Sequence, residues 1–161
     1  MHPPILGTRT LHWPDERHCA DYAAALARSP ALRHAFIELH GPLGAGKTTL
    51  VRHLLRALGV TGRIKSPSYA VLEPHVLHDA AGELPISHFD FYRFTDPREW
   101  ADAGFREIFA APGLKLAEWP EHAAGQLPVP DLRLHIASQP DETRQVRAEA
   151  LTPTGQALLA C

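Results

Sequence analysis

The residues with the most specific chemistry lie in one short segment, Gly41–Thr48. This segment fits the phosphate-binding pattern G-x-x-x-x-G-K-[ST] at every fixed position. Glycines let backbone N–H groups approach phosphate oxygens, a lysine such as Lys47 can bridge the terminal phosphates, and a hydroxyl such as that of Thr48 can ligate Mg²⁺. The segment therefore predicts a binding site for a nucleoside triphosphate and Mg²⁺.

A strand and a helix must hold this loop in place. Ala35–His40 is short and mostly apolar, which predicts a strand directly before the loop. Lys47–Leu58 carries leucine and valine at helical spacing on one face, and Gly59 supplies the stop, which predicts a helix directly after it. This order places bound phosphates at the positive end of a helix.

Composition limits the class of protein. A chain of 161 residues that is 45% hydrophobic is the right size for a single domain, which we expect to be one P-loop domain over residues 1–161. The net charge of −2 and the scattered basic residues argue against tight binding to nucleic acid. Cys19 and Cys161 form no C-x-x-C pair or zinc spacing, which favours a reduced, cytoplasmic setting. No apolar run suits a bilayer span, so we expect no membrane insertion.

The rest of the chain alternates between helix and strand signals. Asp15 is expected to cap a helix that runs to about Arg28. The other predicted elements are strands at Tyr69–Leu72 and Ile86–Phe91 separated by a hairpin turn at Asp79–Glu83, a short helix after Asp96, strands at Leu114–Trp119, Leu132–Ala137 and Gln145–Leu151, and a final helix from Pro153. Interleaved strands and helices predict an α/β, P-loop NTPase-like three-layer fold with a central, partly mixed β-sheet.

Two acidic residues end predicted strands and could hold a metal. Asp90 closes Ile86–Asp90, and Glu118 closes Leu114–Glu118. Strand ends of an α/β sheet converge on its ligand. Hydrolysis or phosphoryl transfer needs a carboxylate there to support Mg²⁺, directly or through water. From the residues alone, either acid could serve.

Two other polar groups carry weaker signals. Ser66–Tyr69 places two hydroxyls around a proline, which suits either a turn or a sensor of the γ-phosphate. His75, His78 and His88, with Asp79 or Asp90, are metal-ligand types. These candidate ligands lack a second closely spaced pair of ligand residues to complete a metal site, so we interpret the histidines as surface or strand-edge residues.

Four segments in order along the chain resemble the bacterial TsaE family, the small ATPase needed to make N6-threonylcarbamoyladenosine on tRNA. The family patterns are L-x-G-D-L-G-A-G-K-T-T, S-P-[ST]-[FY], D-x-Y-R and E-W-[PA]-[ED]. The matching segments are Leu39–Thr49, Ser66–Tyr69, Asp90–Arg93 and Glu118–Glu121. Pro42 stands where the family commonly has Asp, which removes one backbone donor and one carboxylate from the loop. Ser68 replaces the commoner Thr.

The resemblance implies an ATP site with assigned roles. Lys47 holds the phosphates, Thr48 ligates Mg²⁺, and Glu118 supports the metal and the attacking water, with Asp90 sharing that role. The implied catalytic residues are thus Lys47, Asp90 and Glu118, and the implied metal residues are Thr48, Asp90 and Glu118. Ser66–Tyr69 is implied to respond to the nucleotide. The implied nucleotide contacts are Gly41, Leu43, Gly44, Ala45, Gly46, Lys47, Thr48, Thr49, Ser68 and Trp119.

The function implied by the resemblance is Mg²⁺-dependent ATP binding and hydrolysis in the machinery that makes N6-threonylcarbamoyladenosine at position 37 of tRNA. The implied partners are a carbamoyltransferase and its inactive paralogue, with tRNA contacted only weakly or indirectly. A small-molecule P-loop kinase is the alternative. Such kinases usually add a lid with arginines, and Arg93, Arg98 and Arg106 form no obvious lid. A GTP-dependent switch needs N-K-x-D, and the sequence has no asparagine.

Overall fold

The computed structural model describes residues 3–65, 67 and 71–161. Within them, seven strands form one sheet in the order β1-β7-β6-β2-β5-β4-β3. The strands are β1 (Gly7–Trp13), β2 (Phe36–His40), β3 (Leu72–Asp79), β4 (Gly82–Asp90), β5 (Leu114–Glu118), β6 (Leu132–Ser138) and β7 (Arg144–Ala150). The α-helices are α1 (Glu16–Arg28), α2 (Lys47–Leu58), α3 (Pro97–Asp102), α4 (Phe105–Ala110) and α5 (Pro153–Leu159), and the 3-10 helices are η1 (Pro30–Leu32) and η2 (Pro120–Ala123).

The centre of the sheet is parallel and its margins are antiparallel. β2 pairs in parallel with both β5 and β6, and β4 pairs in parallel with β5. β1 pairs antiparallel with β7, β7 with β6, and β3 with β4. The predicted partly mixed sheet is therefore confirmed.

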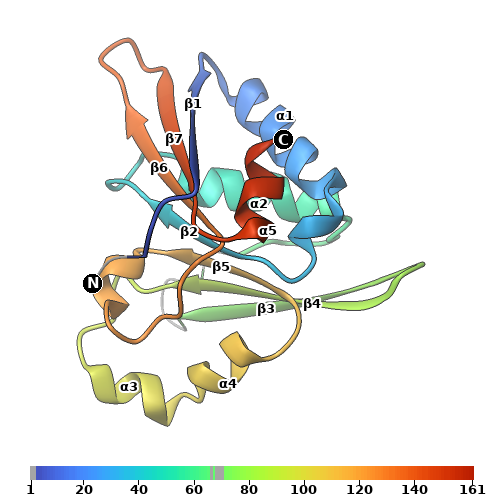
Figure 1. Cartoon of the computed structure of the whole chain (residues 1–161), viewed down its shortest axis with the longest axis vertical. Helices are drawn as coiled ribbons and strands as arrows, with labels where there is room; N and C mark the ends of the chain where they lie inside the picture. Colours follow the sequence, from blue (N-terminus) through green and yellow to red (C-terminus); the bar gives the residue numbers. More distant parts are fainter. Residues whose placement is uncertain (1–2, 66, 68–70) are drawn as a thin grey trace.

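Helices cover the sheet from both sides, which gives three layers (Figure 1). On one side, α1, α2 and α5 pack over a mainly aliphatic core that includes Leu26, Leu50 and Leu116. On the other, α3 and α4 pack over an aromatic core built around Phe89 and Trp100. The predicted three-layer α/β fold is confirmed. None of the helices in the described part of the chain combines the length and the hydropathy that crossing a membrane requires.

Most elements near the P-loop lie where the sequence predicts them. The side chain of Asp15 caps α1 by accepting a hydrogen bond from the backbone N–H of His18 at 3.1 Å. Helix α2 begins at Lys47 and ends at Leu58, with Gly59 in the left-handed conformation at its C-terminus. The hairpin turn between β3 and β4 is also confirmed.

Two edge strands differ from the predictions. In its described part, the strand predicted at Tyr69–Leu72 is wrong at Val71, which is a bend with φ of 64°, and is confirmed only at Leu72, where β3 begins. Tyr69 lies outside the described residues. β3 carries Pro74, which is tolerated because an edge strand needs hydrogen bonds on only one side. β1, the opposite edge, was not predicted; its residues are mostly exposed and give little hydrophobic alternation. Helix α4 was not predicted either.

Candidate nucleotide site

The loop Gly41–Thr48 joins the end of β2 to the first turn of α2. Gly41, Gly44 and Gly46 all have positive φ, at 152°, 79° and 107°. A Cβ on Gly41 would lie 2.5 Å from the carbonyl oxygen of Ile136, so this position has no room for a side chain. No side chain caps the N-terminus of α2. The first N–H groups of a helix have no intrahelical partner, and they suit an anion.

The side chain of Lys47 is folded against the loop. It is 5% exposed, and its ammonium donates a hydrogen bond to the carbonyl oxygen of Gly41. The same ammonium lies 3.7 Å from the centroid of the Trp119 ring, within cation–π range. Burial lowers the pKa of Lys47, and the nearby Glu118 carboxylate opposes this most strongly. The positive charge is therefore held at the site by an aromatic face and a carbonyl.

Asp90 and Glu118 come together because β4 and β5 pair in parallel with these two residues opposite each other. Glu118 is 2% exposed, and its Oε1 accepts a hydrogen bond from the Thr48 hydroxyl at 2.8 Å. Asp90 accepts a hydrogen bond from the backbone N–H of Tyr92 at 3.0 Å. Burial raises the pKa of Asp90, and the negative charge of Glu118 adds to this effect. The structure thus brings three oxygen-bearing side chains, from α2, β4 and β5, to the lining of one cavity.

One cavity of about 390 Å³ is lined by nearly all the predicted site residues. These are Leu43, Gly44, Ala45, Gly46, Lys47, Thr48, Thr49, Asp90, Glu118 and Trp119. Gly41 lies at the base of the loop and is not among the lining residues. Ser68, also predicted to contact the nucleotide, lies outside the described residues, as do Ser66 and Tyr69.

Trp119 forms one wall of this cavity. Its backbone is in the left-handed conformation, with φ of 55°, which turns the chain sharply after β5. Its ring centroid lies 5.0 Å from that of Tyr92 and 5.3 Å from that of His122. Trp119 therefore contacts the Lys47 ammonium and also the rings of Tyr92 and His122.

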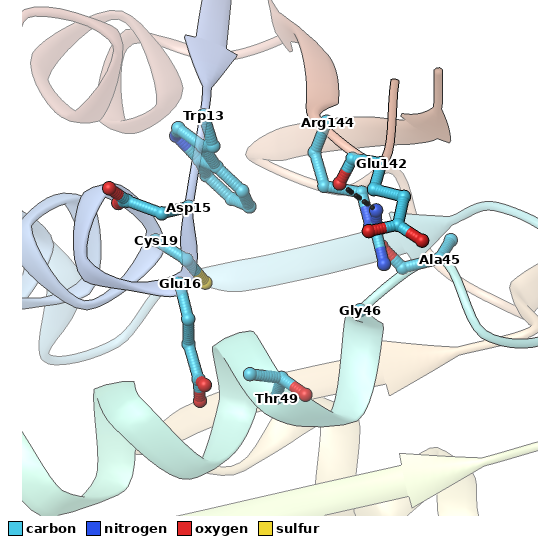
Figure 2. Close-up of a pocket in the computed structure, with 9 residues that line it drawn as sticks. All are labelled: Trp13, Asp15, Glu16, Cys19, Ala45, Gly46, Thr49, Glu142 and Arg144. Atoms are coloured by element: carbon cyan, nitrogen blue, oxygen red, sulfur yellow. Dashed lines mark hydrogen bonds between the residues drawn. The ribbon is translucent and has the colours of Figure 1, made fainter. Parts of the chain in front are cut away.

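A second cavity of about 190 Å³ lies next to the loop (Figure 2). Trp13 and Arg144 flank it from opposite sides, and Thr49 lies at its base. Cys19 and Glu142 also line it. The two cavities share Ala45, Gly46, Thr49 and Arg144, so they lie on either side of the same loop.

Sequence reasoning missed Arg144, at the start of β7. Its Nε donates a hydrogen bond to the carbonyl oxygen of Ala45 at 2.9 Å, and its Nη1 donates one to that of Glu142 at 2.8 Å (Figure 2). The guanidinium thereby fastens the β6–β7 connection to the loop Gly41–Thr48. No local pattern marks this residue, because its partner lies 99 positions away in the chain.

Sequence reasoning assigned no site role to His88 and interpreted it as a surface or strand-edge residue, which is wrong because β4 lies between β5 and β3 and this side chain is completely covered. This residue is fully buried on β4, and its Nε2 lies 2.6 Å from Oε2 of Glu118. Among the described residues, no group of three or more His, Cys, Asp or Glu side chains is placed to hold a metal ion. In particular, the structure forms no such group from His75, His78 and His88.

Comparison with known proteins shows the family to which the chain belongs. The family model "Threonylcarbamoyl adenosine biosynthesis protein TsaE" matches residues 13–146. The Haemophilus influenzae protein named tRNA threonylcarbamoyladenosine biosynthesis protein TsaE is 35% identical over 155 residues, which cover 94% of this chain and 95% of the relative. The Bacillus subtilis protein of the same name is 32% identical over 143 residues, with coverage of 89% and 84%.

The fold also matches a solved structure. The crystal structure of Bacillus subtilis YdiB superposes with a TM-score of 0.75 at 24% identity, and the match covers 96% of this chain and 93% of YdiB. At this identity the match shows a shared fold. Because the family model spans most of the chain and the Haemophilus relative aligns over nearly the whole length of both proteins, this chain belongs to the TsaE family.

Proposed function

We propose that the chain binds ATP with Mg²⁺ and hydrolyses it as the ATPase component of the machinery that makes N6-threonylcarbamoyladenosine at position 37 of tRNA. Its proposed partners are the carbamoyltransferase of that machinery and the enzyme's inactive paralogue. One observation carries the ATPase assignment: the phosphate-binding loop, Thr48, Asp90 and Glu118 all line one cavity. The pathway assignment rests on the family model and the names of the relatives.

The loop fits a triphosphate by both shape and charge. Its glycines have positive φ, and the start of α2 has no side-chain cap, so backbone N–H groups are available to phosphate oxygens. The ammonium of Lys47 is already held at the edge of the cavity by Trp119 and Gly41. A phosphate oxygen offers this ammonium a charged acceptor in place of a carbonyl, and charge-assisted hydrogen bonds are the stronger kind.

The oxygen atoms that line the cavity fit Mg²⁺. This ion keeps several waters and usually takes one or two protein carboxylates together with substrate phosphates, so it does not need a cage of three acidic side chains. The Thr48 hydroxyl and the carboxylates of Asp90 and Glu118 would supply hard oxygen ligands in the lining of this cavity. When bound, the metal would neutralise charge that develops on the transferred phosphoryl group.

The second cavity suits the base and ribose of the nucleotide. It adjoins the loop through Ala45 and Gly46 and places the indole of Trp13 opposite the guanidinium of Arg144 (Figure 2). An adenine ring has a flat π-face that can stack on aromatic and guanidinium groups. We propose that the nucleoside occupies this cavity while the phosphates lie in the larger one.

Several contacts must break before the groups around the phosphates can react. The Thr48 hydroxyl is bonded to Glu118 rather than to a metal, and the Lys47 ammonium lies on Trp119. Because these contacts must first break, we expect the chain alone to hydrolyse ATP slowly. In our proposal the two protein partners favour the rearranged state and so raise the rate.

The test compares the parent protein with Glu118→Gln and Lys47→Ala. Phosphate release and tryptophan fluorescence are followed with and without the two partners. The parent should hydrolyse ATP slowly and faster with partners, whereas tRNA without partners should change little. Glu118→Gln should bind ATP yet hydrolyse it roughly 10²-fold more slowly, because it loses the charge that orients metal and water. Lys47→Ala should lose binding.

Two results would contradict the proposal. Hydrolysis by Glu118→Gln at the parent rate would remove this residue from the reaction. Transfer of the γ-phosphate to a member of a small-metabolite panel, with no free phosphate released, would favour the P-loop kinase instead.

A further inference from the structure

His88 makes an unusual buried contact with Glu118. The histidine is 0% exposed and Glu118 is 2% exposed, and His88 Nε2 lies 2.6 Å from Glu118 Oε2. The other ring nitrogen, Nδ1, is buried and has no hydrogen-bond partner in the described part of the chain. In the described part of the chain, the contact to Glu118 is therefore the one hydrogen bond that this imidazole makes.

This arrangement is costly as a packing solution. Burying an imidazole with one nitrogen unpaired carries a desolvation cost that an apolar residue would avoid. The flanking positions on β4 that are also buried, Ile86 and Phe89, carry apolar side chains. The position of His88 is thus explained by what it does to Glu118 rather than by packing of the core.

Two contacts from different elements fix the Glu118 carboxylate in the present structure. Thr48 on α2 bonds to Oε1 at 2.8 Å, and His88 on β4 bonds to Oε2. If Thr48 turns its hydroxyl towards Mg²⁺, as the proposed function requires, the first contact is lost. The contact from His88 can remain, because His88 lies on β4 rather than on α2 and bonds to Oε2 rather than to Oε1.

We propose that His88 is a positioning residue, which holds the carboxylate of Glu118 in its reactive orientation after Thr48 has released it. This inference rests on the proposed ATPase function. Partners that hydrogen-bond a metal-supporting carboxylate commonly contribute 10- to 100-fold to metal affinity or activity. Loss of His88 should leave the phosphate-binding loop and the Lys47 contacts intact, so metal-free nucleotide binding should not change.

The experiment compares His88→Leu, His88→Gln and the matched control His75→Leu with the parent. His75 lies on β3, which pairs with β4, and its buried Nε2 has no partner in the described residues, so the control removes an imidazole that does not touch Glu118. Glutamine keeps an N–H donor, whereas leucine removes it. Thermal unfolding first establishes that each variant is folded.

The readouts are ATP binding by tryptophan fluorescence, with Mg²⁺ and with EDTA, and phosphate release. For His88→Leu we expect a Mg²⁺ requirement raised and a kcat lowered by about 10- to 100-fold, with KM and metal-free binding close to the parent values. His88→Gln should recover most of this loss, and His75→Leu should match the parent.

Three outcomes would overturn the inference. In the first, His88→Leu has the parent's Mg²⁺ requirement and kcat. In the second, it loses metal-free binding to the same extent, which indicates a purely structural role. In the third, the Gln variant is as defective as Leu, which shows that the N–H is irrelevant. If His88→Leu does not fold, His88→Met replaces it as the variant without an N–H donor and is compared with His88→Gln. If the parent binds ATP but does not hydrolyse it, the ATPase proposal fails while the fluorescence measurement still tests His88.

Discussion

Gly41→Ala should damage the phosphate-binding loop far more than Gly44→Ala, although both are glycine-to-alanine changes in one loop. A Cβ on Gly41 would lie 2.5 Å from the carbonyl oxygen of Ile136, about 0.9 Å closer than ordinary van der Waals contact. That oxygen belongs to β6, a strand paired on both sides, so it cannot move aside easily. At Gly44 a Cβ would meet nothing within 4 Å.

The magnitudes follow from this difference. Both glycines have positive φ, at 152° and 79°, and a non-glycine residue there costs roughly 1–2 kcal/mol. Gly41→Ala adds overpacking against a fixed backbone, roughly another 1–3 kcal/mol. We therefore expect the free energy of unfolding to fall by about 2–5 kcal/mol for Gly41→Ala and by about 1–2 kcal/mol for Gly44→Ala.

Urea unfolding of the nucleotide-free proteins at 25 °C measures both values. Because the carbonyl oxygen of Gly41 accepts the hydrogen bond from Lys47, displacement of this residue should also weaken ATP binding. Equal losses of stability in the two variants would refute the steric argument. So would a Gly41→Ala protein that unfolds and binds ATP like the parent.

Two further predictions concern residues around the loop. Burial raises the pKa of the Asp90 carboxyl above its ordinary value of 3.8, so the folded protein binds a proton at Asp90 more tightly than the unfolded chain does. The free energy of unfolding therefore falls as pH rises from about 3.8 through the raised pKa. Asp90→Asn should then be more stable than the parent at pH 7, and the difference in stability should shrink below pH 4. Thermal unfolding of both proteins across this pH range measures the difference, and an Asn variant less stable than the parent at pH 7 would contradict the prediction. Arg144→Ala removes the charged hydrogen bond to the Ala45 carbonyl, worth roughly 1.5 kcal/mol or more, and should weaken ATP binding about tenfold. Arg147→Ala, on the same strand but bonded to Glu149, is the matched control in an ATP titration, and equal affinity in the two variants would remove Arg144 from the site.

The local elements of the site could be predicted from the sequence because each is encoded within a few turns of chain. The helix over Lys47–Leu58 and its end at Gly59 follow from apolar spacing and a stop signal, and both are confirmed. The same holds for α1, where the apolar stripe includes Cys19 and Leu26, both of them buried in the structure. In these cases the interactions that fix the structure are close in sequence.

Edge strands were harder to predict because a strand with only one neighbour in the sheet places fewer restrictions on residue type. β1 and β3 each have one neighbour in the sheet, so their outward positions tolerate polar residues and even Pro74. Hydrophobic alternation is the main sequence signal for a half-buried strand. It is weak in β1 because most positions of this edge strand are exposed. The beginning of β3 at Leu72 was accordingly missed.

The sequence by itself predicted the parts of the proposed site: a loop with the phosphate-binding pattern between a strand and a helix, and acidic residues at the ends of two later strands. Tertiary structure alone decided that Asp90 and Glu118 are direct neighbours, because the parallel register of β4 and β5 sets this pairing. It also decided that His88 reaches Glu118 and that Arg144 reaches the loop, across 30 and 99 positions of chain. The physical reason is that such contacts depend on strand order and register, which the packing of the whole sheet fixes and no local pattern records.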